Sequence, residues 1–465
     1  MHLSSNDFVS LENLLCASRS ATTPVAFDHE NTISWAEFQH DVACYAKMLS
    51  THNAERIALC FSDSYLFSVG FFAVCYTQKS LVLPGNYQTE AVKELQEHFD
   101  LLMHDDAVSI ADGIPELTVR KQSHLSTSPQ PIGGQSSENL QPLDASTIDL
   151  TLFTSGSSGK AKAINKSLAQ LDTEIAILQS LWGEQLEGTR IESTVSHQHI
   201  YGLLFRLLWP LCAARPFAIQ NLEFPEQIVH HANSDTALIS SPALLKRLTE
   251  EHQRTPLRAV FSSGGPLPNS AATHSEELFS QLPIEVFGST ETGGIAYRQQ
   301  FSASTYWTLF PSVEAELNQE RCLRLCAPHI NGSHWYQTAD ECYFHDKVSF
   351  ELKGRTDRIV KVEEKRISLV EVEKRLEQLA WISESAVIPM TEGNRLSLCA
   401  VLVLTDAGKQ EIETLGKGKF WVALRKALRD WLEPIAIPRK YRVVDEVPLN
   451  SQGKRQVAEI EKLFQ

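Results

Sequence analysis

Short apolar runs alternate with amphipathic stretches through the first third of the chain. Residues 56–61 and 81–84 are predicted to form buried strands, with a buried helix at Leu66–Tyr76 between them. A further helix is predicted to begin at Ser34, because Ser34 and Glu37 have the spacing of a capping box. Strands that alternate with helices are typical of a parallel sheet with crossover helices, so we predict an α/β fold.

Three later strands are predicted, and each ends in small or polar residues. They are Thr236–Ser240, Arg258–Ser262 and Ile284–Phe287. Ligands bind beyond the carboxyl ends of strands in open parallel sheets, so these endings predict one shared cleft. Before them, residues 121–146 are predicted to form a surface loop, and a core-facing helix capped by Ser167 is predicted at 168–182.

A second, smaller unit is predicted near the carboxyl end of the chain. Its predicted elements are a helix with a capping box at Ser368 and Glu371, a strand at 396–404, a helix at 420–432 and a strand at 441–444. We therefore expect a large N-terminal domain at 1–354, with mixed or parallel sheets sandwiched by helices. A hinge at 355–357 would join it to a small, mobile α+β domain at 358–465.

Composition narrows the class of protein. The chain has 465 residues, of which 43% are hydrophobic, so it is long enough for two domains with a sizeable core. A formal net charge of -15 argues against nucleic acid or an anionic membrane as the main partner. The nine cysteines are scattered, and neither a signal peptide nor a membrane-spanning run is evident. We expect a cytoplasmic protein, and the oligomeric state stays open.

One group of cysteines and a histidine could suggest zinc. Its members are Cys322, Cys326, His329 and Cys342. Residues 314–326, however, alternate as an exposed strand does, with the first two cysteines on one face and Leu323 and Leu325 on the other. We therefore interpret the four as ordinary side chains.

The stretch Thr151–Lys162 combines an apolar strand end, a run of hydroxyls and glycines, and two lysines. Glycines let the backbone approach phosphate oxygens, and N–H groups, hydroxyls and lysines can bind them. The Walker pattern is not met, because only two residues separate Gly156 from Gly159 and Ala161 follows Lys160. A flexible Gly/Ser turn is the alternative for such a loop alone.

With its flanks, this loop resembles the phosphate loop of the adenylate-forming enzymes, which include acyl-CoA synthetases, aryl-acid ligases and nonribosomal-peptide adenylation domains. Ala161 and Ala163 stand where that family has proline and glycine. The resemblance implies ATP as a substrate. The implied phosphate-binding residues are Thr154, Ser155, Gly156, Ser157, Ser158, Gly159 and Lys162.

The run Phe287–Thr292 resembles the Tyr-Gly-x-Thr-Glu run of the same family. The resemblance implies that Phe287 stacks on adenine, that Thr290 contacts phosphate and the acyl carboxylate, and that Glu291 holds Mg²⁺. A strand end followed by a Ser/Thr turn is the alternative. The other implied nucleotide-binding residues are Gly265, Gly288, Ser289, Asp340 and Arg355.

Two later segments also follow the family's order. Gln337–Asp340 resembles its Thr-Gly-Asp, with Ala339 for glycine, and a carboxylate can accept both hydroxyls of a ribose. Arg355-Thr356-Asp357 resembles the hinge, in which the arginine also reaches the ribose and Asp357 is the pivot. An ordinary surface turn is the alternative for the second segment.

The segment Pro448–Lys454 resembles the family's Pro-Leu-x-x-x-Gly-Lys near the carboxyl end. It implies that Lys454 is the catalytic lysine, together with Thr290 and Glu291. Its ammonium would bridge the incoming carboxylate oxygen and the α-phosphate, and so stabilise charge that develops in the transition state. By itself, Lys454 would be a solvated surface group.

The acyl pocket is implied by Ser196–Gly202, which matches a His-x-x-Gly segment. His199, Gly202 and Gly264 would line this pocket, although His199 fits a core histidine equally well. No aspartate stands nearby to pair with a substrate ammonium, and a buried unpaired ammonium is costly. The substrate is therefore expected to be an uncharged acyl or aryl acid.

Glu364 stands where the family has a glycine that lets the pantetheine arm pass. This departure favours a carrier-bound phosphopantetheine thiol over free CoA as the acceptor. We predict an ATP- and Mg²⁺-dependent acid–thiol ligase that forms acyl-AMP and then transfers the acyl group, preferably to an acyl carrier protein. The alternatives are a free-CoA acyl or aryl ligase, a degenerate nucleotide-binding module and a P-loop NTPase.

Overall fold

The computed structural model presents the chain as two units. The described residues are 8–85, 87–122, 140–155, 161–231, 233–249, 252–302, 305–330, 332–362, 365–392, 395–429, 431–432, 434–450 and 455–465. The first unit comprises Met1–Val313 and Cys326–His334, and the second comprises Glu314–Leu325 and Trp335–Gln465. The hinge predicted at 355–357 falls within the second unit's range, and its role stays a prediction.

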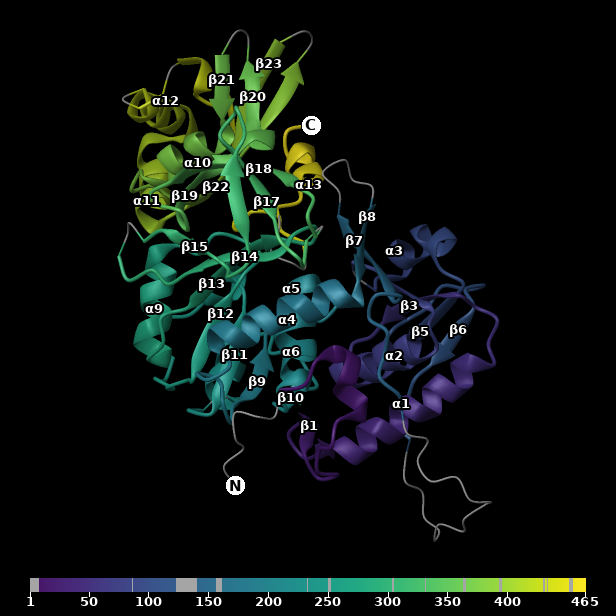
Figure 1. The fold of residues 1–465 in the computed structure, drawn as a ribbon. Helices are drawn as coiled ribbons and strands as arrows, with labels where there is room; N and C mark the ends of the chain where they lie inside the picture. The colour runs from purple at the N-terminus through teal and green to yellow at the C-terminus, as the bar shows by residue number, and fades with distance from the viewer. Residues whose placement is uncertain are drawn as a thin grey trace, which may run out of the picture. The chain divides into compact units, whose positions relative to one another are not determined.

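The larger sheet of the first unit has a parallel centre (Figure 1). In spatial order its strands are β15 (Trp307–Leu309), β14 (Gly293–Arg298), β13 (Ile284–Ser289), β12 (Ala259–Ser262), β11 (Thr236–Ser240), β9 (Arg190–Ser193), β10 (Phe217–Ala218), β1 (Pro24–Phe27) and β2 (Thr32–Ser34). From β13 to β1 every neighbouring pair is parallel, whereas β14 and β2 pair antiparallel with their neighbours. The three predicted strands are thus adjacent.

A second sheet of the first unit carries the predicted phosphate loop. Its order is β6 (Glu116–Thr118), β5 (Leu101–His104), β3 (Arg56–Cys60), β4 (Ser80–Leu83), β7 (Asp149–Ser155) and β8 (Ala161–Ser167). All pairs are parallel except β7 with β8, which is antiparallel. The mixed α/β architecture predicted from the alternation of elements is confirmed.

Helices cover these sheets. They are α1 (Trp35–Ser50), α2 (Ser64–Tyr76), α3 (Thr89–Glu94), α4 (Leu168–Trp182), α5 (Ile200–Gly202), a π-helix (Leu203–Leu208), α6 (Trp209–Cys212), α7 (Pro225–His231), α8 (Pro242–Leu245) and α9 (Asn269–Phe279), with 3-10 turns at Leu11–Cys16 and Gln96–His98. The capping box at Ser34 is present, and Ser167 forms another with Gln170. Both predicted helix starts are confirmed.

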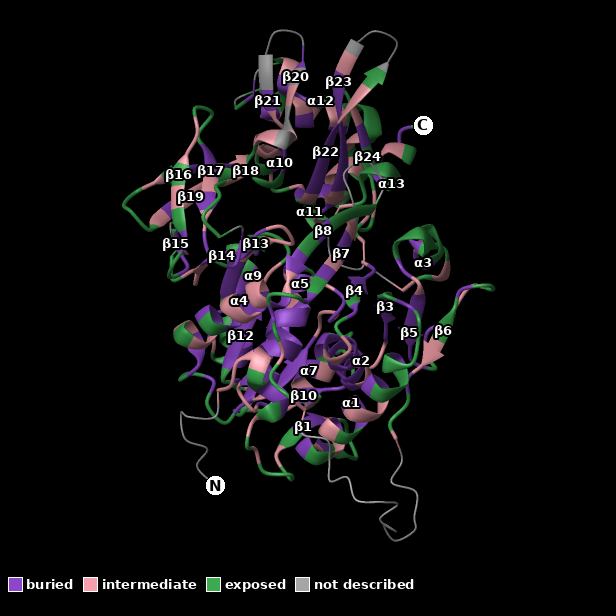
Figure 2. Ribbon diagram, turned by 45° about the vertical axis from the view of Figure 1, so that its right-hand side comes forward, coloured by how far each residue is buried: buried purple, intermediate pink, exposed green. Residues whose placement is uncertain are grey.

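Burial follows the predicted pattern. Nearly every residue of α2 is buried, whereas α3 and β6 expose residues to solvent (Figure 2). At the end of α4 the Trp182 ring lies 5.2 Å from the Phe261 ring of β12 and 5.5 Å from the Tyr297 ring of β14. The apolar stripe of α4 therefore packs on the larger sheet, as its spacing predicts.

The second unit is built from three antiparallel or mixed sheets and short helices. Its elements are β16 (Glu314–Leu317), β17 (Cys322–Cys326), β18 (Tyr336–Phe344), β19 (Ser349–Arg355), a 3-10 turn (Thr356–Arg358), β20 (Ile359–Val362), β21 (Lys365–Ser368), α10 (Leu369–Glu377), β22 (Ile382–Glu392), β23 (Arg395–Leu404), α11 (Asp406–Leu415), α12 (Lys417–Leu428), a 3-10 turn (Pro434–Ala436), β24 (Lys440–Val443) and α13 (Val457–Lys462). The β22–β23 pair is antiparallel and β23–β24 is parallel. Apolar residues of α10, α12 and these strands form one core.

Three local predictions for this unit need correction. Residues 314–326 form two strands rather than one, because Asn318 Oδ1 accepts the N–H of Cys322 at 2.8 Å and Arg321 adopts a φ of 62°. Ser368 caps α10 through the N–H of Glu371, but the Glu371 carboxylate pairs with Arg375 at 2.7 Å instead of completing a capping box. The predicted helix at 420–432 is α12, which begins and ends earlier.

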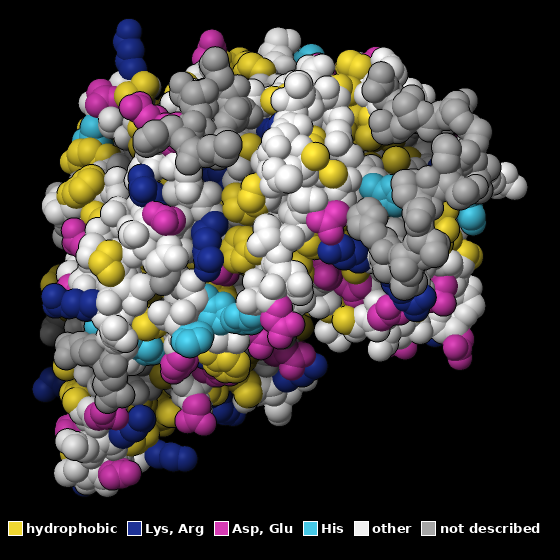
Figure 3. Space-filling view, turned by 90° about the horizontal axis from the view of Figure 1, so that it is seen from below, with side chains coloured by type: hydrophobic (Ala, Val, Ile, Leu, Met, Phe, Trp, Pro, Cys, Tyr) yellow, Lys and Arg dark blue, Asp and Glu magenta, His cyan; other side chains and the backbone are white. Residues whose placement is uncertain are grey.

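Three histidine side chains of the first unit lie close together at the surface. The rings of His29 and His231 lie 4.1 Å apart, and those of His230 and His231 lie 5.4 Å apart. One face shows histidines gathered among interspersed acidic and basic side chains (Figure 3). Across the described ranges, no group of three His, Cys, Asp or Glu side chains is arranged as metal ligands, and no helix is long and apolar enough to cross a bilayer.

Candidate active site

The polar endings of β11, β12 and β13 lie at one edge of the larger sheet. Ser240 pairs in register with Ser262, and Ser262 pairs with Glu285, from which β13 continues to Gly288 and Ser289. Ser263, just beyond β12, donates its hydroxyl to the carbonyl of Val286 at 2.8 Å. The carboxyl ends of these strands therefore meet, as the sequence predicts.

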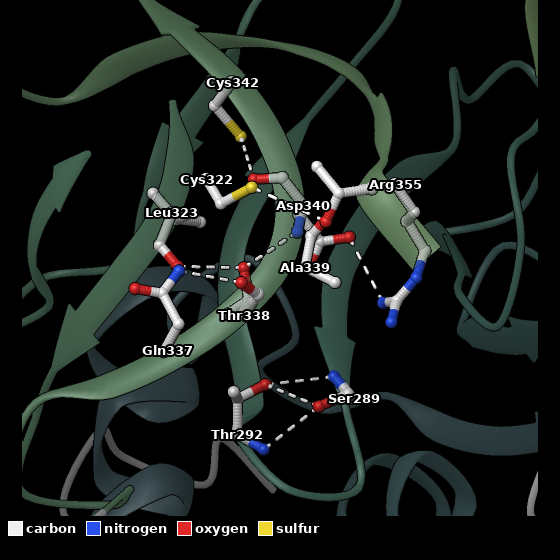
Figure 4. Close-up of polar contacts among 11 residues, drawn as sticks. Ser289, Thr292, Cys322, Leu323, Gln337, Thr338, Ala339, Asp340, Cys342 and Arg355 are labelled. Carbon is white, nitrogen blue, oxygen red and sulfur yellow. Dashed lines mark hydrogen bonds and ion pairs between the residues drawn. The ribbon is translucent and has the colours of Figure 1, made fainter. Parts of the chain in front are cut away.

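A tight turn follows β13 and presents Thr290 and Glu291. The N–H of Ser289 donates to Thr292 Oγ1 at 3.0 Å, and the N–H of Thr292 donates to Ser289 Oγ at 3.2 Å (Figure 4). Thr292 Oγ1 also donates to the carbonyl of Gly293 at 2.8 Å. These bonds satisfy the turn internally, and the side chains of Thr290 and Glu291 are left partly exposed.

Lys162 of β8 reaches this turn from the second sheet. Its Nζ lies 2.6 Å from Glu291 Oε1. Burial acts to raise the pKa of Glu291, but the ammonium of Lys162, the N–H of Glu291 and the Ser289 side chain together outweigh it, so the net pKa is lowered and the carboxylate is ionised at neutral pH. Lys162, a predicted phosphate-binding residue, and Glu291, the predicted Mg²⁺ ligand, are 129 positions apart in the chain and thus meet.

Two buried side chains form hydrogen bonds to the backbone of the same turn. Lys166 of β8 donates from Nζ to the carbonyl of Glu291 at 3.1 Å, and Glu174 of α4 accepts the N–H of Gly294 at 2.6 Å. Gly293 has a φ of +68°, and a Cβ there would collide with the Glu174 carboxylate. Burial raises the pKa of Glu174 to about 7, although Lys166 opposes this rise. The backbone of the turn is therefore fixed at both ends.

His329 completes this buried group. Its Nε2 donates to the carbonyl of Gly294 at 2.9 Å, since a carbonyl can only accept. Burial lowers the pKa of His329 to about 4, so the ring is neutral. Of the four residues that could suggest zinc, His329 thus donates to the carbonyl of Gly294. Cys322 contacts Thr356 Oγ1, and Cys342 contacts the carbonyl of Asp340.

Lys166, Glu174 and His329 were not predicted from the sequence. One signal was present for Glu174, which falls between Leu171 and Leu178 on the apolar stripe of α4. A carboxylate on the core face of a helix needs a buried partner, so its position in the apolar stripe indicates a buried polar contact. Lys166 and His329 carry no such local signal, because their partners lie far away in the chain.

Phe287, Gly264 and Gly265 lie close to this edge. The Phe287 ring lies 5.4 Å from that of Trp307, over which Arg298 places its guanidinium carbon at 4.5 Å. Gly264 and Gly265 are exposed, and open space surrounds the position of a Cβ at Gly265. Their predicted roles toward adenine and the acyl group stay predictions.

The segment after β9 joins the two sheets of the first unit. His197 donates from Nε2 to the carbonyl of Phe61 at 3.1 Å and accepts from Ser64 Oγ at 3.0 Å. Burial lowers the pKa of His197, so the ring is neutral. The predicted pocket residue His199 is partly buried at the start of α5. A Cβ at Gly202 would collide with the carbonyl of Ser196, which gives this glycine a packing role.

The predicted ribose contacts lie in the second unit. Asp340 and Arg355 pair in register across β18 and β19, and Arg355 Nη1 lies 3.3 Å from Asp340 Oδ1 (Figure 4). The N–H of Asp340 donates to Thr338 Oγ1 at 3.1 Å, and Thr338 donates to the carbonyl of Leu323 at 2.9 Å. The Asp340 side chain is 9% exposed, so neighbouring strands fix its orientation.

A buried carboxylate ties two further motifs of the second unit together. Glu373 of α10 lies 2.6 Å from Arg358 Nη2, which directly follows Asp357, and 2.5 Å from Arg455 Nη1, which directly follows Lys454. Arg455 also donates to the carbonyl of Ser385 at 2.7 Å. Glu373 thus pairs both with Arg358, next to the predicted pivot, and with Arg455, next to the predicted catalytic lysine.

Several predicted site residues fall outside the described positions. They are Gly156, Ser157, Ser158, Gly159 and Lys454, together with the acceptor-related Glu364 and the side chains of Ser155 and Asp357. The backbone of Ser155 ends β7, and that of Asp357 lies in the 3-10 turn after β19. The catalytic, binding and hinge roles of all these residues stay predictions.

Comparison with known proteins agrees with the resemblance. Residues 16–333 match the family described as AMP-binding enzyme. The chain is 25% identical over 336 residues to a 4-coumarate–CoA ligase of Halorhodospira halophila, covering 70% of this chain and 79% of that protein. It is also 25% identical over 223 residues to a D-alanine–D-alanyl carrier protein ligase of Staphylococcus haemolyticus, covering 44% of this chain and 42% of that protein.

Solved structures share the fold over nearly the whole chain. One is an o-succinylbenzoate CoA synthetase from Bacillus subtilis in complex with its acyl-adenylate intermediate, with a TM-score of 0.75 at 18% identity and coverage of 97% of this chain and 98% of that one. The family match spans both sheets of the first unit and the turn that bears Glu291. The chain belongs to the AMP-binding enzyme family, that of the adenylate-forming ligases.

Proposed function

We propose that this protein is an AMP-forming acid–thiol ligase that adenylates an uncharged acyl or aryl acid and passes the acyl group to a phosphopantetheine thiol. One observation carries the proposal: Lys162 Nζ lies 2.6 Å from Glu291 Oε1. This contact joins the strand after the phosphate loop to the turn that bears Thr290. A cationic and an anionic group beside hydroxyls suit a nucleotide triphosphate with its metal ion.

In the first step a carboxylate oxygen attacks the α-phosphate of ATP, and pyrophosphate leaves. Lys162 and the hydroxyls of the loop bind the phosphates, and Thr290 orients the α-phosphate and the acid. Asp340 accepts the ribose hydroxyls with Arg355 beside it. Lys454 places its ammonium between the two reacting oxygens and stabilises their charge in the transition state. Orientation of both substrates supplies much of the rate.

The side chains present fit a Mg²⁺ ion brought in with ATP. Glu291 is ionised at neutral pH, and the described side chains offer no further carboxylate cage beside it. Mg²⁺ typically uses one or two protein carboxylates and takes its other ligands from phosphates and water. Glu291 would hold the ion, which neutralises charge on the phosphates when bound.

Two observations support the substrate class and the acceptor. Residues 195–202 contain no carboxylate to pair with a substrate ammonium, which favours an uncharged acid. Glu364 in place of glycine favours a thiol delivered by an acyl carrier protein over free CoA. In the second step that thiol displaces AMP, after rotation about Asp357. This chemistry fits a cytoplasmic enzyme.

Acid-dependent pyrophosphate release tests the proposal. The assay presents MgATP with a panel of aryl, short-chain and medium-chain acids and identifies the nucleotide product. We expect pyrophosphate and AMP with at least one uncharged acid. ADP would indicate phosphoryl transfer to water instead, and no release with any acid would indicate a degenerate nucleotide-binding module. Holo carrier protein and free CoA as acceptors then separate the two ligase types.

A further inference from the structure

The α12 helix carries a stripe of basic residues in an otherwise acidic chain. Lys419, Val422, Lys426 and Arg429 are exposed and recur at helical spacing, within an arc of about 80° at 100° per residue. Phe420, Leu424 and Leu428, on the opposite side, are buried in the core of the second unit. The chain as a whole has a formal net charge of -15, so this face departs from its average.

The helix dipole favours Lys426 in the last turn of α12 and Arg429 at its C-cap, but it does not account for Lys419. Cations stabilise the last turn of a helix and are unfavourable in its first turn, because the helix dipole is positive there. Lys417 and Lys419 both lie in the first turn of α12, which contains no acidic residue. Within the described ranges, Lys419, Lys426 and Arg429 form no ion pair. These cations are left available for a partner.

Apolar surface accompanies the charges. Val422 in the middle of the stripe is 59% exposed, and Trp431, just beyond the helix, is 60% exposed. The guanidinium carbon of Arg375 lies 4.7 Å from the centroid of the Trp431 ring, and Glu371 holds Arg375 at 2.7 Å. An exposed tryptophan held in this way, beside cations, is typical of a protein-binding surface.

We propose that this face, Lys419, Val422, Lys426, Arg429 and Trp431, docks an acidic helix of the thiol-bearing carrier protein. The identity of the partner rests on the proposed function. From Lys419 to Arg429 the stripe spans about 15 Å, which matches about three turns of a partner helix with carboxylates at helical spacing. Complementary charge orients the carrier and speeds its association.

Two other anionic partners fit less well. Nucleic-acid binding draws its affinity from many Lys and Arg contacts to phosphates, and this stripe offers three cations in an acidic chain. A membrane-surface helix inserts its apolar face, whereas the apolar face of α12 is buried in the unit's own core. An acidic protein helix needs only the exposed charges and the small apolar patch.

Charge reversal tests the surface. The variant Lys419→Glu/Lys426→Glu/Arg429→Glu is compared with Lys47→Glu/Lys93→Glu/Lys347→Glu, which changes three exposed cations elsewhere by the same net charge. The probe is a holo acyl carrier protein of bacterial fatty acid synthesis, with free CoA and phosphatidylglycerol vesicles as comparators. We expect the stripe variant to lose about tenfold or more in carrier affinity, and the salt dependence of binding to weaken.

Two further readouts keep the proposals distinct. Acid-dependent pyrophosphate release and any reaction with free CoA should be unchanged in the stripe variant, because α12 carries none of the predicted ATP-site residues. Equal carrier affinity in the stripe variant and its control would overturn the docking proposal, as would loss of vesicle binding alone. Absence of pyrophosphate release in the wild type would overturn the ligase assignment, and carrier binding would still be measurable.

Discussion

Lys162 and Glu291 form an ion pair of 2.6 Å between β8 and the turn after β13. The pair is partly exposed, and Glu291 keeps a lowered pKa although burial acts to raise it. The contact with Lys162 is one of the causes that lower the pKa of Glu291, the predicted Mg²⁺ ligand, so this carboxylate stays ionised to lower pH than an ordinary glutamate. The turn itself is fixed separately by Lys166 and Glu174.

Replacement of Lys162 therefore changes the pH dependence as well as the rate. In Lys162→Ala the pKa of Glu291 rises, so the acid limb of the pH profile for pyrophosphate release moves to higher pH. We also expect a loss of about tenfold or more in kcat/KM for ATP, because a charged phosphate contact disappears. Lys121→Ala, which removes a partly exposed cation paired with Glu37 at 2.9 Å, is the matched control. An unchanged acid limb in Lys162→Ala would argue against this role.

Glu174 predicts a pH dependence of stability. Its pKa in the folded protein is raised from 4.5 to about 7 by burial, so the folded state binds a proton that the unfolded state releases. The free energy of unfolding therefore decreases as pH rises from about 4.5 to 7, by up to about 3 kcal/mol from this group. Glu174→Gln removes this contribution while its amide oxygen still accepts the Gly294 N–H.

The measurement is the Tm of both proteins between pH 5 and pH 8. The Tm of Glu174→Gln relative to the Tm of the wild type should rise as pH increases. Glu184→Gln, which changes an exposed carboxylate, should track the wild type throughout. Parallel curves for wild type and Glu174→Gln would show that the buried carboxyl does not titrate in this range.

Asp340 predicts discrimination between ribose and deoxyribose. Asp340→Asn keeps the shape of the side chain but removes a charged acceptor, so we expect ATP affinity to fall by about tenfold. The wild type should prefer ATP to 2′-deoxyATP and 3′-deoxyATP, whereas the variant should bind all three alike. Asp346→Asn, at an exposed turn of the same unit, serves as the control. Retained preference in Asp340→Asn would place the ribose elsewhere.

The sequence predicts local features of this protein better than its distant contacts. The capping box at Ser34, the helix cap at Ser167 and the strands of the parallel sheet were predicted from residue spacing and the pattern of apolar positions. The turn at 318–321 was missed, because the alternation of 314–326 continues through it while Arg321 adopts a positive φ. The buried trio of Lys166, Glu174 and His329 was missed because its bonds join elements far apart in the chain.

The same limit applies to Glu373, for which the sequence predicts only a position in the helix that Ser368 caps. It contacts Arg455 across 82 positions of sequence. Arg455→Gln removes the charged contact with Glu373 at the position next to Lys454. We therefore expect kcat for pyrophosphate release to fall at least tenfold with little change in KM for ATP. Arg439→Gln, at an exposed position, is the control. In a Lys454→Ala background, Arg455→Gln should cause no further loss, whereas an additional loss would indicate a purely structural role.

The most direct measurement of the central claim is pyrophosphate release by Lys454→Ala, together with its affinity for ATP. If the ammonium of Lys454 and the phosphate loop act on the same nucleotide, the variant should lose at least a hundredfold in acid-dependent pyrophosphate release while it binds ATP within a few-fold of the wild type. Pyrophosphate release at the wild-type rate in Lys454→Ala would contradict the account.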